Sequence, residues 1–377
     1  MKTIPYGKHY IDEKDIKFVI KTLKKDKITT GTTTIEFENK ISDYLKCKYV
    51  STCNSGTSAL YLAMQSLNIK KNDTIIMPSI NFVSSYSIAK LFGAKVFLAD
   101  VDRYTGQMRP DDVINCIKKF KLKNIKALIV MYNGGYPQNA EKFIKLKKKY
   151  KFYIIEDACH ALGAIYKTNN KTFKIGSCAH SDVCTFSLHP LKTITTGEGG
   201  LVTTNIKLID TNIKKLRSLG LARDKKKHWK YDAVFKGLNF RMTDFQAALG
   251  ISQLSKIKKF LNYRVKVKNI YNKNLNRNKK IYTPDHKKNY ASSNHLYIIN
   301  FIKPNLKKKE NFIKTMLQKN IILQYHYIPI YKFKIFDDKF ISQNAEIYYK
   351  SSVSLPIYYG LKFKEQKKVI ENINKYI

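Results

Sequence analysis

The first two thirds of the chain alternate short apolar runs with amphipathic segments of helical period. Six runs have the length and composition of buried strands, and they cover residues 74–77, 95–99, 127–131, 153–156, 183–187 and 201–204. Helical patterns lie between several of them, for example at residues 111–121 and 141–150. Such regular alternation of strand and helix predicts an α/β domain built on a mostly parallel sheet.

The amino-acid composition of the chain changes near residue 258, after which Lys and Asn are more frequent. Beyond this point, apolar runs predict strands at 296–301 and 321–325, with a helix between them. Just before this change, Thr243 and Gln246 have the spacing of a capping box that opens a long helix. We therefore expect a large domain over residues 1–257 and a smaller α+β domain over residues 258–377. The N-terminal segment can pack on the small domain.

The formal net charge of +42 raises the question of a nucleic-acid partner. Lys outnumbers Arg 63 to 7, however, and the lysines are spread along the chain. A protein selected for phosphate and base contacts would keep more Arg, and neither end carries a helix-turn-helix or winged module. We expect no nucleic-acid partner, although the charge would attract small anionic substrates.

Three features of the sequence bear on where the protein is located in the cell. No run of about 18 apolar residues occurs, so no transmembrane helix is expected, and the first residues lack the apolar core of a secretion signal. The six cysteines form no C-x-x-C pair and have no zinc-ligand spacing with histidine. We expect reduced thiols in a cytoplasmic protein without a metal site or a membrane partner.

A first candidate site is residues 54–60, which read N-S-G-T-S-A-L and precede an apolar helical pattern. Gly56 lets a backbone approach closely, and the free N–H groups of a helix start form an anion site together with the helix dipole. An ordinary helix cap is the simpler interpretation of this segment taken alone.

Two further candidates follow predicted strands. Phe82 lies beyond the strand at 74–77, where an aromatic ring could stack on a flat cofactor, although a lone aromatic is more often a core residue. Asp157 follows the run at 153–156, and ligands of open α/β sheets bind outside the carboxyl ends of strands. A carboxylate there could hold a proton on a heterocycle nitrogen, or it could cap a helix.

The segment at 186–200 reads F-S-L-H-P-L-K-T-I-T-T-G-E-G-G and places Lys192 in a loop between two predicted strands. Desolvation in a cationic site would lower the pKa of this lysine and free its amine to form a Schiff base. Ser187 could bind phosphate. Asn239 precedes the capped helix within G-L-N-F-R-M-T-D, where a plain loop is the alternative.

Taken in order, these motifs resemble the pyridoxal-phosphate enzymes of fold type I. They are most similar to the sugar aminotransferases of the DegT/DnrJ/EryC/StrS family, and the resemblance covers essentially the whole chain. Its most specific stretches are N-S-G-T-S-A-L, E-D-A-C-H-A-L-G, F-S-L-H-P-L-K-T-I-T-T-G-E-G-G and L-N-F-R-M-T-D-F-Q-A-A-L-G.

The resemblance implies pyridoxal 5'-phosphate as cofactor and a role for each matching residue. Lys192 would bind the cofactor covalently and act as general base and acid, and Asp157 would pair with the pyridine nitrogen. The other implied cofactor contacts are Phe82 on the ring, Ser55, Gly56, Thr57 and Ser187 at the phosphate, and His160 near the phenolic oxygen. Asn239 would reach the phosphate of the neighbouring subunit, because the family's sites lie at the interface of a homodimer.

The second substrate is indicated by the arginines and by the small domain. None of the seven arginines lies beyond Arg277, so no C-terminal Arg is available to clamp a carboxylate. Within the family, the chain resembles the transaminases that aminate the 4-keto group of a UDP-linked 4-keto-6-deoxy-N-acetylhexosamine for pseudaminic-acid-type glycans. This resemblance implies His189, His326 and Tyr327 as substrate contacts and glutamate as the default amino donor.

Several alternatives stay open. Asn81 stands where Thr or Ser is common, and residues 132–139 depart from the usual motif, which leaves another nucleotide-linked keto-deoxyhexose possible as substrate. Family members that act as 3-dehydratases carry His in place of the lysine, whereas Lys192 is present here. A non-catalytic regulatory or nucleic-acid-binding protein on the same fold is the less favoured alternative.

Overall fold

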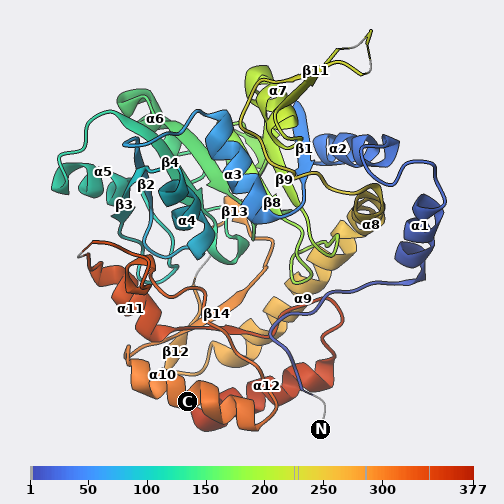
Figure 1. The fold of residues 1–377 in the computed structure, drawn as a ribbon. Helices are drawn as coiled ribbons and strands as arrows, with labels where there is room; N and C mark the ends of the chain where they lie inside the picture. Colours follow the sequence, from blue (N-terminus) through green and yellow to red (C-terminus); the bar gives the residue numbers. More distant parts are fainter. Residues whose placement is uncertain (1–2, 225, 228, 285–286, 339) are drawn as a thin grey trace.

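A computed structural model describes residues 3–224, 226–227, 229–284, 287–338 and 340–377. Its centre is a seven-stranded sheet in the order β1-β9-β8-β5-β4-β2-β3 (Figure 1). The strands are β1 (Tyr49–Cys53), β2 (Thr74–Pro78), β3 (Lys95–Ala99), β4 (Ile125–Met131), β5 (Tyr153–Asp157), β8 (Val183–Ser187) and β9 (Gly200–Thr204). β9 runs antiparallel to its two neighbours, β1 and β8, and the other pairings in the sheet are parallel, so the predicted mostly parallel sheet of an α/β fold is confirmed.

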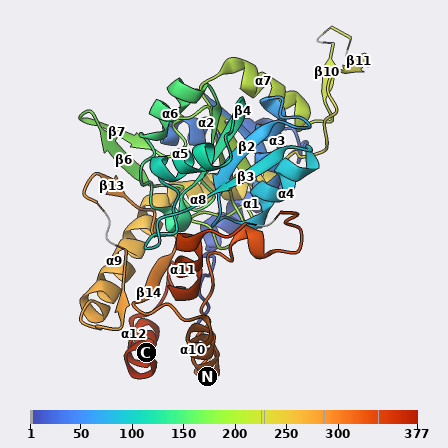
Figure 2. The ribbon, with the colours of Figure 1, turned by 90° about the vertical axis from the view of Figure 1, so that its left-hand side faces the viewer.

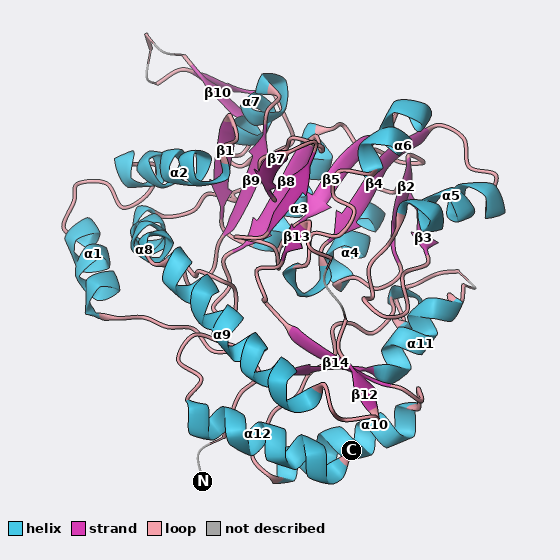
Figure 3. Cartoon of the chain, turned by 180° about the vertical axis from the view of Figure 1, so that it is seen from behind, coloured by secondary structure: helices cyan, strands magenta, loops and turns pink. Residues whose placement is uncertain are grey.

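Helices cover both faces of this sheet (Figure 3). One apolar cluster joins a face of the sheet to α3 (Gly56–Ser66), α4 (Val83–Leu91) and α7 (Lys207–Leu216). A second cluster joins the other face to α2 (Thr32–Leu45), α5 (Pro110–Lys119), α6 (Phe143–Tyr150) and α8 (Asp244–Ser255). Helix α1 (Glu13–Leu23) packs on α8. The loops that follow β2, β5 and β8 line one common cavity.

A third apolar cluster lies below the sheet in the view of Figure 1. It is built by the small sheet β12 (Ile281–Tyr282), β14 (Tyr297–Phe301) and β15 (Ser352–Leu355), and by α10 (Leu306–Gln318) and α12 (Phe363–Tyr376). Helix α9 (Ile257–Leu275) links the two parts, with Phe260 in the large cluster and Tyr271 in the small one. The separate cluster supports a domain boundary near residue 257, which we retain as a proposal.

Ile4 belongs to the small cluster, and its backbone exchanges hydrogen bonds with the carbonyl of Asn320 (2.8 Å) and the amide of Ile322 (2.9 Å). The expected strand at 321–325 is wrong. Its residues form single bridges to two different partners, Ile4 and Ser354, and therefore no continuous ladder. The capping box of Thr243 and Gln246 is present, although α8 ends at Ser255 and α9 begins as a separate helix.

Two smaller sheets lie at the periphery. The strands β6 (Ile165–Thr168), β7 (Lys171–Lys174) and β13 (Tyr290–Ala291) form one of them. The hairpin of β10 (Leu221–Arg223) and β11 (Tyr231–Ala233) is the other, and it projects from the body of the molecule (Figure 2). Two single 3₁₀ turns, η1 (Asn133–Gly135) and η2 (Ile330–Lys332), are also present.

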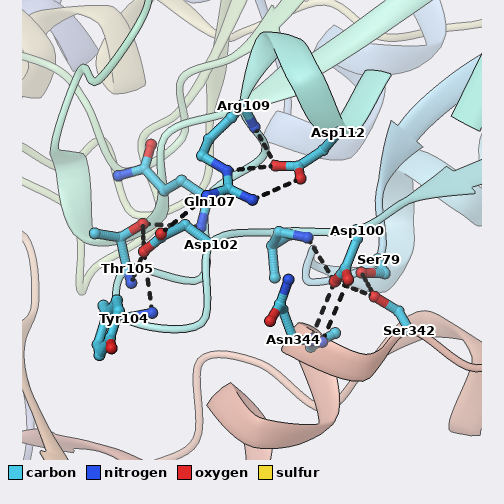
Figure 4. Close-up of polar contacts among 12 residues, drawn as sticks. Ser79, Asp100, Asp102, Tyr104, Thr105, Gln107, Arg109, Asp112, Ser342 and Asn344 are labelled. Atoms are coloured by element: carbon cyan, nitrogen blue, oxygen red, sulfur yellow. Dashed lines mark hydrogen bonds and ion pairs between the residues drawn. The ribbon is translucent and has the colours of Figure 1, made fainter. Parts of the chain in front are cut away.

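Asp100, which follows β3, anchors α11 (Gln343–Ser351) to the edge of the large sheet (Figure 4). Its carboxylate accepts hydrogen bonds from the Ser342 hydroxyl, from the amide of Asn344 (3.3 Å) and from that of Ala345 (3.1 Å). A carboxylate at a helix N-terminus satisfies free N–H groups and complements the helix dipole. From this position α11 directs the hydroxyl of Tyr348 to the backbone carbonyl of His326, at 3.0 Å.

Over the described ranges, no helix is both long and apolar enough to cross a membrane. Within the same ranges, no three His, Cys, Asp or Glu side chains gather in a way that could hold a metal ion. All six cysteines are free thiols.

Candidate active site

A cavity of about 600 Å³ lies at the carboxyl ends of β2, β5 and β8. It brings together every site residue predicted from the sequence except Asn239; these are Ser55, Gly56, Thr57, Phe82, Asp157, His160, Ser187, His189, Lys192, His326 and Tyr327. Segments far apart in the chain therefore converge on one space, as expected for a doubly covered sheet whose loops gather at one edge.

One end of the cavity is the N-terminus of α3. Ser55 caps this helix, and its hydroxyl accepts the amide of Ser58 at 3.0 Å. The amides of Gly56 and Thr57 belong to the first turn, which has no helical carbonyl to bond. A Cβ on Gly56 would lie 2.7 Å from Cβ of Ser187, so only glycine lets the helix start approach this serine so closely. Free amides, a hydroxyl and the helix dipole together make an anion site.

Asp157, at the end of β5, is 2% exposed. Its carboxylate accepts the Ser85 hydroxyl (3.1 Å) and the amide of Cys159 (3.3 Å). No cation among the described residues forms an ion pair with it, and a buried carboxylate normally has one. The environment thus favours a cationic ligand group on the cavity side of Asp157.

Lys192 lies in the loop between β8 and β9, and its amide donates to the carbonyl of His189 at 2.9 Å. Burial lowers the pKa of its ammonium group, and this effect outweighs the opposite influence of Cys159 and Asp157. A lowered pKa increases the fraction of neutral amine, which is the nucleophilic form. The loop therefore presents a nucleophile to the same cavity as Asp157.

The ring of His160 forms hydrogen bonds with Gly134 in the large domain and with Tyr327 in the small domain. Its Nδ1 accepts the backbone amide of Gly134 at 3.3 Å, so the proton of the neutral ring lies on Nε2. That nitrogen is 2.8 Å from the hydroxyl of Tyr327. Burial, with a further contribution from Lys192, holds the pKa of His160 well below its usual range, which keeps the ring neutral.

Both the side chain and the backbone carbonyl of His326 have hydrogen-bond partners. Its Nδ1 lies 2.9 Å from the Ser354 hydroxyl, and its backbone carbonyl accepts hydrogen bonds from the side-chain Nδ2 of Asn133 (3.1 Å) and from the hydroxyl of Tyr348 (3.0 Å). Burial, and next Lys192, lower the pKa of His326 to about 3. His326 is therefore a neutral side chain that could exchange hydrogen bonds with a ligand without carrying charge.

Phe82 is not a core residue, because 51% of its side chain is exposed. Its ring lies 5.7 Å from that of Tyr327, and its amide donates to Oδ1 of Asn81 at 2.7 Å. The Nδ2 group of Asn81 is buried and has no partner among the described residues. The ring of Phe82 is thus available for stacking at the cavity wall.

Other lining residues were missed by sequence reasoning. His295 packs against His160 with ring centres 4.2 Å apart, and Tyr6 faces His326 at 5.6 Å. His295 lies in the segment S-S-N-H-L-Y, residues 292–297, and nothing in that local sequence points to the cavity. Tyr6 had no local pattern at all, because only the tertiary path of the N-terminal segment brings it to the site.

Asn239 is exposed and lies outside the cavity, where it forms a single bridge with Ser218. The structure of one chain therefore does not bring this residue to its own site. An exposed position is what a role in a neighbouring subunit's site requires.

The sequence profile of the DegT/DnrJ/EryC1/StrS aminotransferase family matches residues 9–374. The chain belongs to this family. The recognition made from the sequence motifs and the assignment as an aminotransferase are thus confirmed.

Named relatives agree with this membership. The UDP-4-amino-4,6-dideoxy-N-acetyl-beta-L-altrosamine transaminase of Campylobacter jejuni (strain 81-176) is 34% identical over 373 residues, which cover 98% of this chain and 96% of the relative. The structure of PseC of Helicobacter pylori, an aminotransferase involved in pseudaminic acid biosynthesis, aligns with a TM-score of 0.91 at 26% identity and covers 100% of this chain and 99% of PseC. Spr1654 of Streptococcus pneumoniae in its PLP form aligns with a TM-score of 0.89 at 25% identity, covering 99% and 98% of the two chains.

The residues present fit pyridoxal phosphate, the cofactor that the family implies. The first turn of α3 and Ser187 offer donors to a phosphate, and Gly56 leaves the necessary space. The buried, unpaired carboxylate of Asp157 matches a protonated pyridine nitrogen. Lys192 lines the same cavity with a lowered pKa, as attachment of an aldehyde requires.

Proposed function

We propose that this enzyme uses pyridoxal 5'-phosphate to move an amino group from L-glutamate to the 4-keto group of a UDP-linked 4-keto-6-deoxy-N-acetylhexosamine. The observation that carries the proposal is the presence of Asp157 and Lys192 in one cavity, with the first turn of α3 at its end. The cofactor, when bound, supplies an aldehyde and an electron sink.

The residues of the chain would divide the work. Asp157 holds a proton on the ring nitrogen, since a carboxylate beside a cation favours the charged form. The amides of Gly56 and Thr57 and the hydroxyl of Ser187 hold the phosphate, and Phe82 covers the ring. The free amine of Lys192 would take the proton from the donor's α carbon and later return one as general acid.

The choice of a sugar as second substrate is supported by the lining. No arginine is among the described residues that line the cavity, so no bidentate clamp for a second carboxylate is available there. His189, His326 and Tyr327 offer neutral hydrogen-bonding groups, as suits hydroxyl and carbonyl groups of a sugar. The names of the Campylobacter and Helicobacter relatives support the UDP-linked amino sugar of the pseudaminic acid pathway.

We further propose a homodimer with shared sites, in which Asn239 completes the phosphate site of the partner. Large apolar side chains are exposed on and after α1, as a protein interface requires. They are Ile16, Ile20, Leu23, Ile28 and Ile35, between 43% and 57% exposed. Six free thiols support a reducing, cytoplasmic location.

The test is a pair of half-reactions. Protein loaded with pyridoxal phosphate is mixed with L-glutamate, and the loss of the visible absorbance of the cofactor is followed together with the release of 2-oxoglutarate. A panel of nucleotide-linked 4-keto and 3-keto sugars then reports which one restores the absorbance. The proposal expects restoration by the UDP-linked 4-keto sugar, and restoration by a different sugar alone would contradict the substrate.

A further inference from the structure

Lys309, on α10, is the side chain outside the cavity that most needs an explanation. It is 0% exposed, whereas its neighbours Lys307 and Lys308 on the same helix are exposed. Lysine is almost never fully buried without a paired carboxylate. Among the described residues, the one acidic group that acts on it is Glu310, the next residue of the helix, and the two form no ion pair.

Two tyrosine rings take the place of the missing carboxylate. The ammonium nitrogen lies 4.0 Å from the ring centre of Tyr325 and 4.4 Å from that of Tyr349. It also donates a hydrogen bond to the carbonyl of Tyr349. The two rings meet edge to face at 5.8 Å. A desolvated cation between two aromatic faces is held by cation–π attraction, which depends on its charge.

Tyr325 connects this arrangement to the active site. It lines the catalytic cavity, as do Gln324, His326 and Tyr327 on either side of it, whereas Lys309 does not. His326 and Tyr327 have hydrogen-bond partners in β15 and at His160. The ring of Tyr325 is instead held by the cation behind it. We propose that Lys309 is a positioning residue, which fixes Tyr325 and the segment 324–327 in the conformation that receives the nucleotide sugar.

The charge of Lys309 makes this positioning dependent on pH. Burial lowers its pKa to about 7, and Glu310 opposes this shift only in part. The other charged groups around the two rings are Glu346, which lies near Tyr349, and Lys332, which pairs with Glu346 at 2.7 Å. As the pH rises through about 7, Lys309 loses its proton and its cation–π attraction. The segment should then become less ordered and bind its ligand less tightly.

The free energy of unfolding changes with pH in the opposite direction to the order of this segment. A lysine whose pKa falls on folding is more protonated in the unfolded state between pH 7 and its ordinary pKa, so stability rises with pH over that interval. Near pH 7 the buried cation costs stability. Replacing it by methionine should therefore leave the melting temperature unchanged or raise it, while it loosens Tyr325. This divergence separates positioning from a merely structural role.

The experiment compares Lys309→Met with Lys308→Met, which removes the same charge from the exposed face of the same helix. Hydrogen–deuterium exchange of the cofactor-loaded enzyme is measured on the peptide that contains residues 324–327, as protection factors at pH 6 and pH 8. We expect protection to fall in Lys309→Met at pH 6, to fall in the wild type between pH 6 and pH 8, and to stay at the wild-type value in Lys308→Met. Unchanged protection in Lys309→Met would overturn the proposal. A fall in protection that is accompanied by a fall in the melting temperature would also overturn it.

Binding of UDP-N-acetylglucosamine, a stable nucleotide sugar, gives the functional readout. Because this part rests on the proposed function, it is scored separately from exchange. We expect a Kd about tenfold weaker in Lys309→Met at pH 6, the size of a lost cation–π contact. Equal affinities would contradict the role in ligand binding. Failure of the wild type to bind would count against the nucleotide-sugar substrate, while exchange would still decide the role of Lys309.

Discussion

The hydroxyl of Tyr327 lies 2.8 Å from Nε2 of His160, whose other nitrogen accepts a backbone amide. The direction of the bond follows, because a neutral His160 with an accepting Nδ1 carries its proton on Nε2 and donates it to Tyr327. The tyrosine's own proton is then available to a ligand. Burial raises the pKa of Tyr327 well above its usual value, so the hydroxyl keeps this proton over the working pH range.

Removing that hydroxyl should slow the transfer of the amino group to the sugar more than its removal from glutamate. In Tyr327→Phe the developing charge on the sugar's keto oxygen loses a donor in a site shielded from water. We expect a decrease of about 10²-fold in the rate of the second half-reaction, measured by stopped-flow absorbance. Equal slowing of both half-reactions would assign the hydroxyl to the cofactor instead of the sugar.

Asp157→Asn should retain the fold and the phosphate contacts but lose the charge that holds the pyridine proton. We expect both half-reactions to slow by about 10²-fold or more. Ser85→Ala is the matched control, since it removes a hydrogen bond to the same carboxylate and leaves the charge in place. Similar rates for the wild type and Asp157→Asn would reduce Asp157 to a structural cap.

The shared site is tested by mixing two inactive homodimers, Lys192→Ala and Asn239→Ala. If Asn239 serves the partner's site, one site of a mixed dimer collects both lesions and the other has neither. Mixing should then restore up to about half of the activity of a wild-type dimer. Subunit exchange is followed with mass-tagged chains. Confirmed exchange without recovery, with Asn239→Ala inactive on its own, would make Asn239 a residue of its own chain's site.

Apolar runs predicted the fold well where the strands are buried. The strands at Lys95–Ala99 and Val183–Ser187 have the predicted bounds. Strand β1 (Tyr49–Cys53) was missed because its sequence, Y-V-S-T-C, mixes Ser and Thr with apolar residues. The run at 321–325 is apolar because it packs in the small core, yet its backbone partners belong to two different segments. Periodicity reports burial, and it does not report which backbone is nearby.

The residues of the candidate site likewise fall into those that a local motif predicts and those that only tertiary packing brings to the cavity. Residues in local motifs, such as Gly56 and Lys192, were predicted because their neighbours in sequence are also their neighbours in space. Tyr6 reaches the cavity through the N-terminal segment, where its carbonyl accepts the amide of Ile357 in the small domain. His295 reaches it because the amide of its neighbour Leu296 donates to the carbonyl of Gly134 in the large domain. Lys309 could not be distinguished from the surface lysines around it, because its burial depends on where α11 places Tyr349.

Attachment of the cofactor to Lys192 is tested by borohydride reduction followed by peptide mapping. Borohydride makes the bond between a lysine amine and pyridoxal phosphate permanent, and mass spectrometry then locates it. We expect one modified peptide in the wild type, with the added mass on Lys192, and none in Lys192→Ala under the same conditions. Modification of a different lysine in the wild type, or an equal yield in Lys192→Ala, would contradict it.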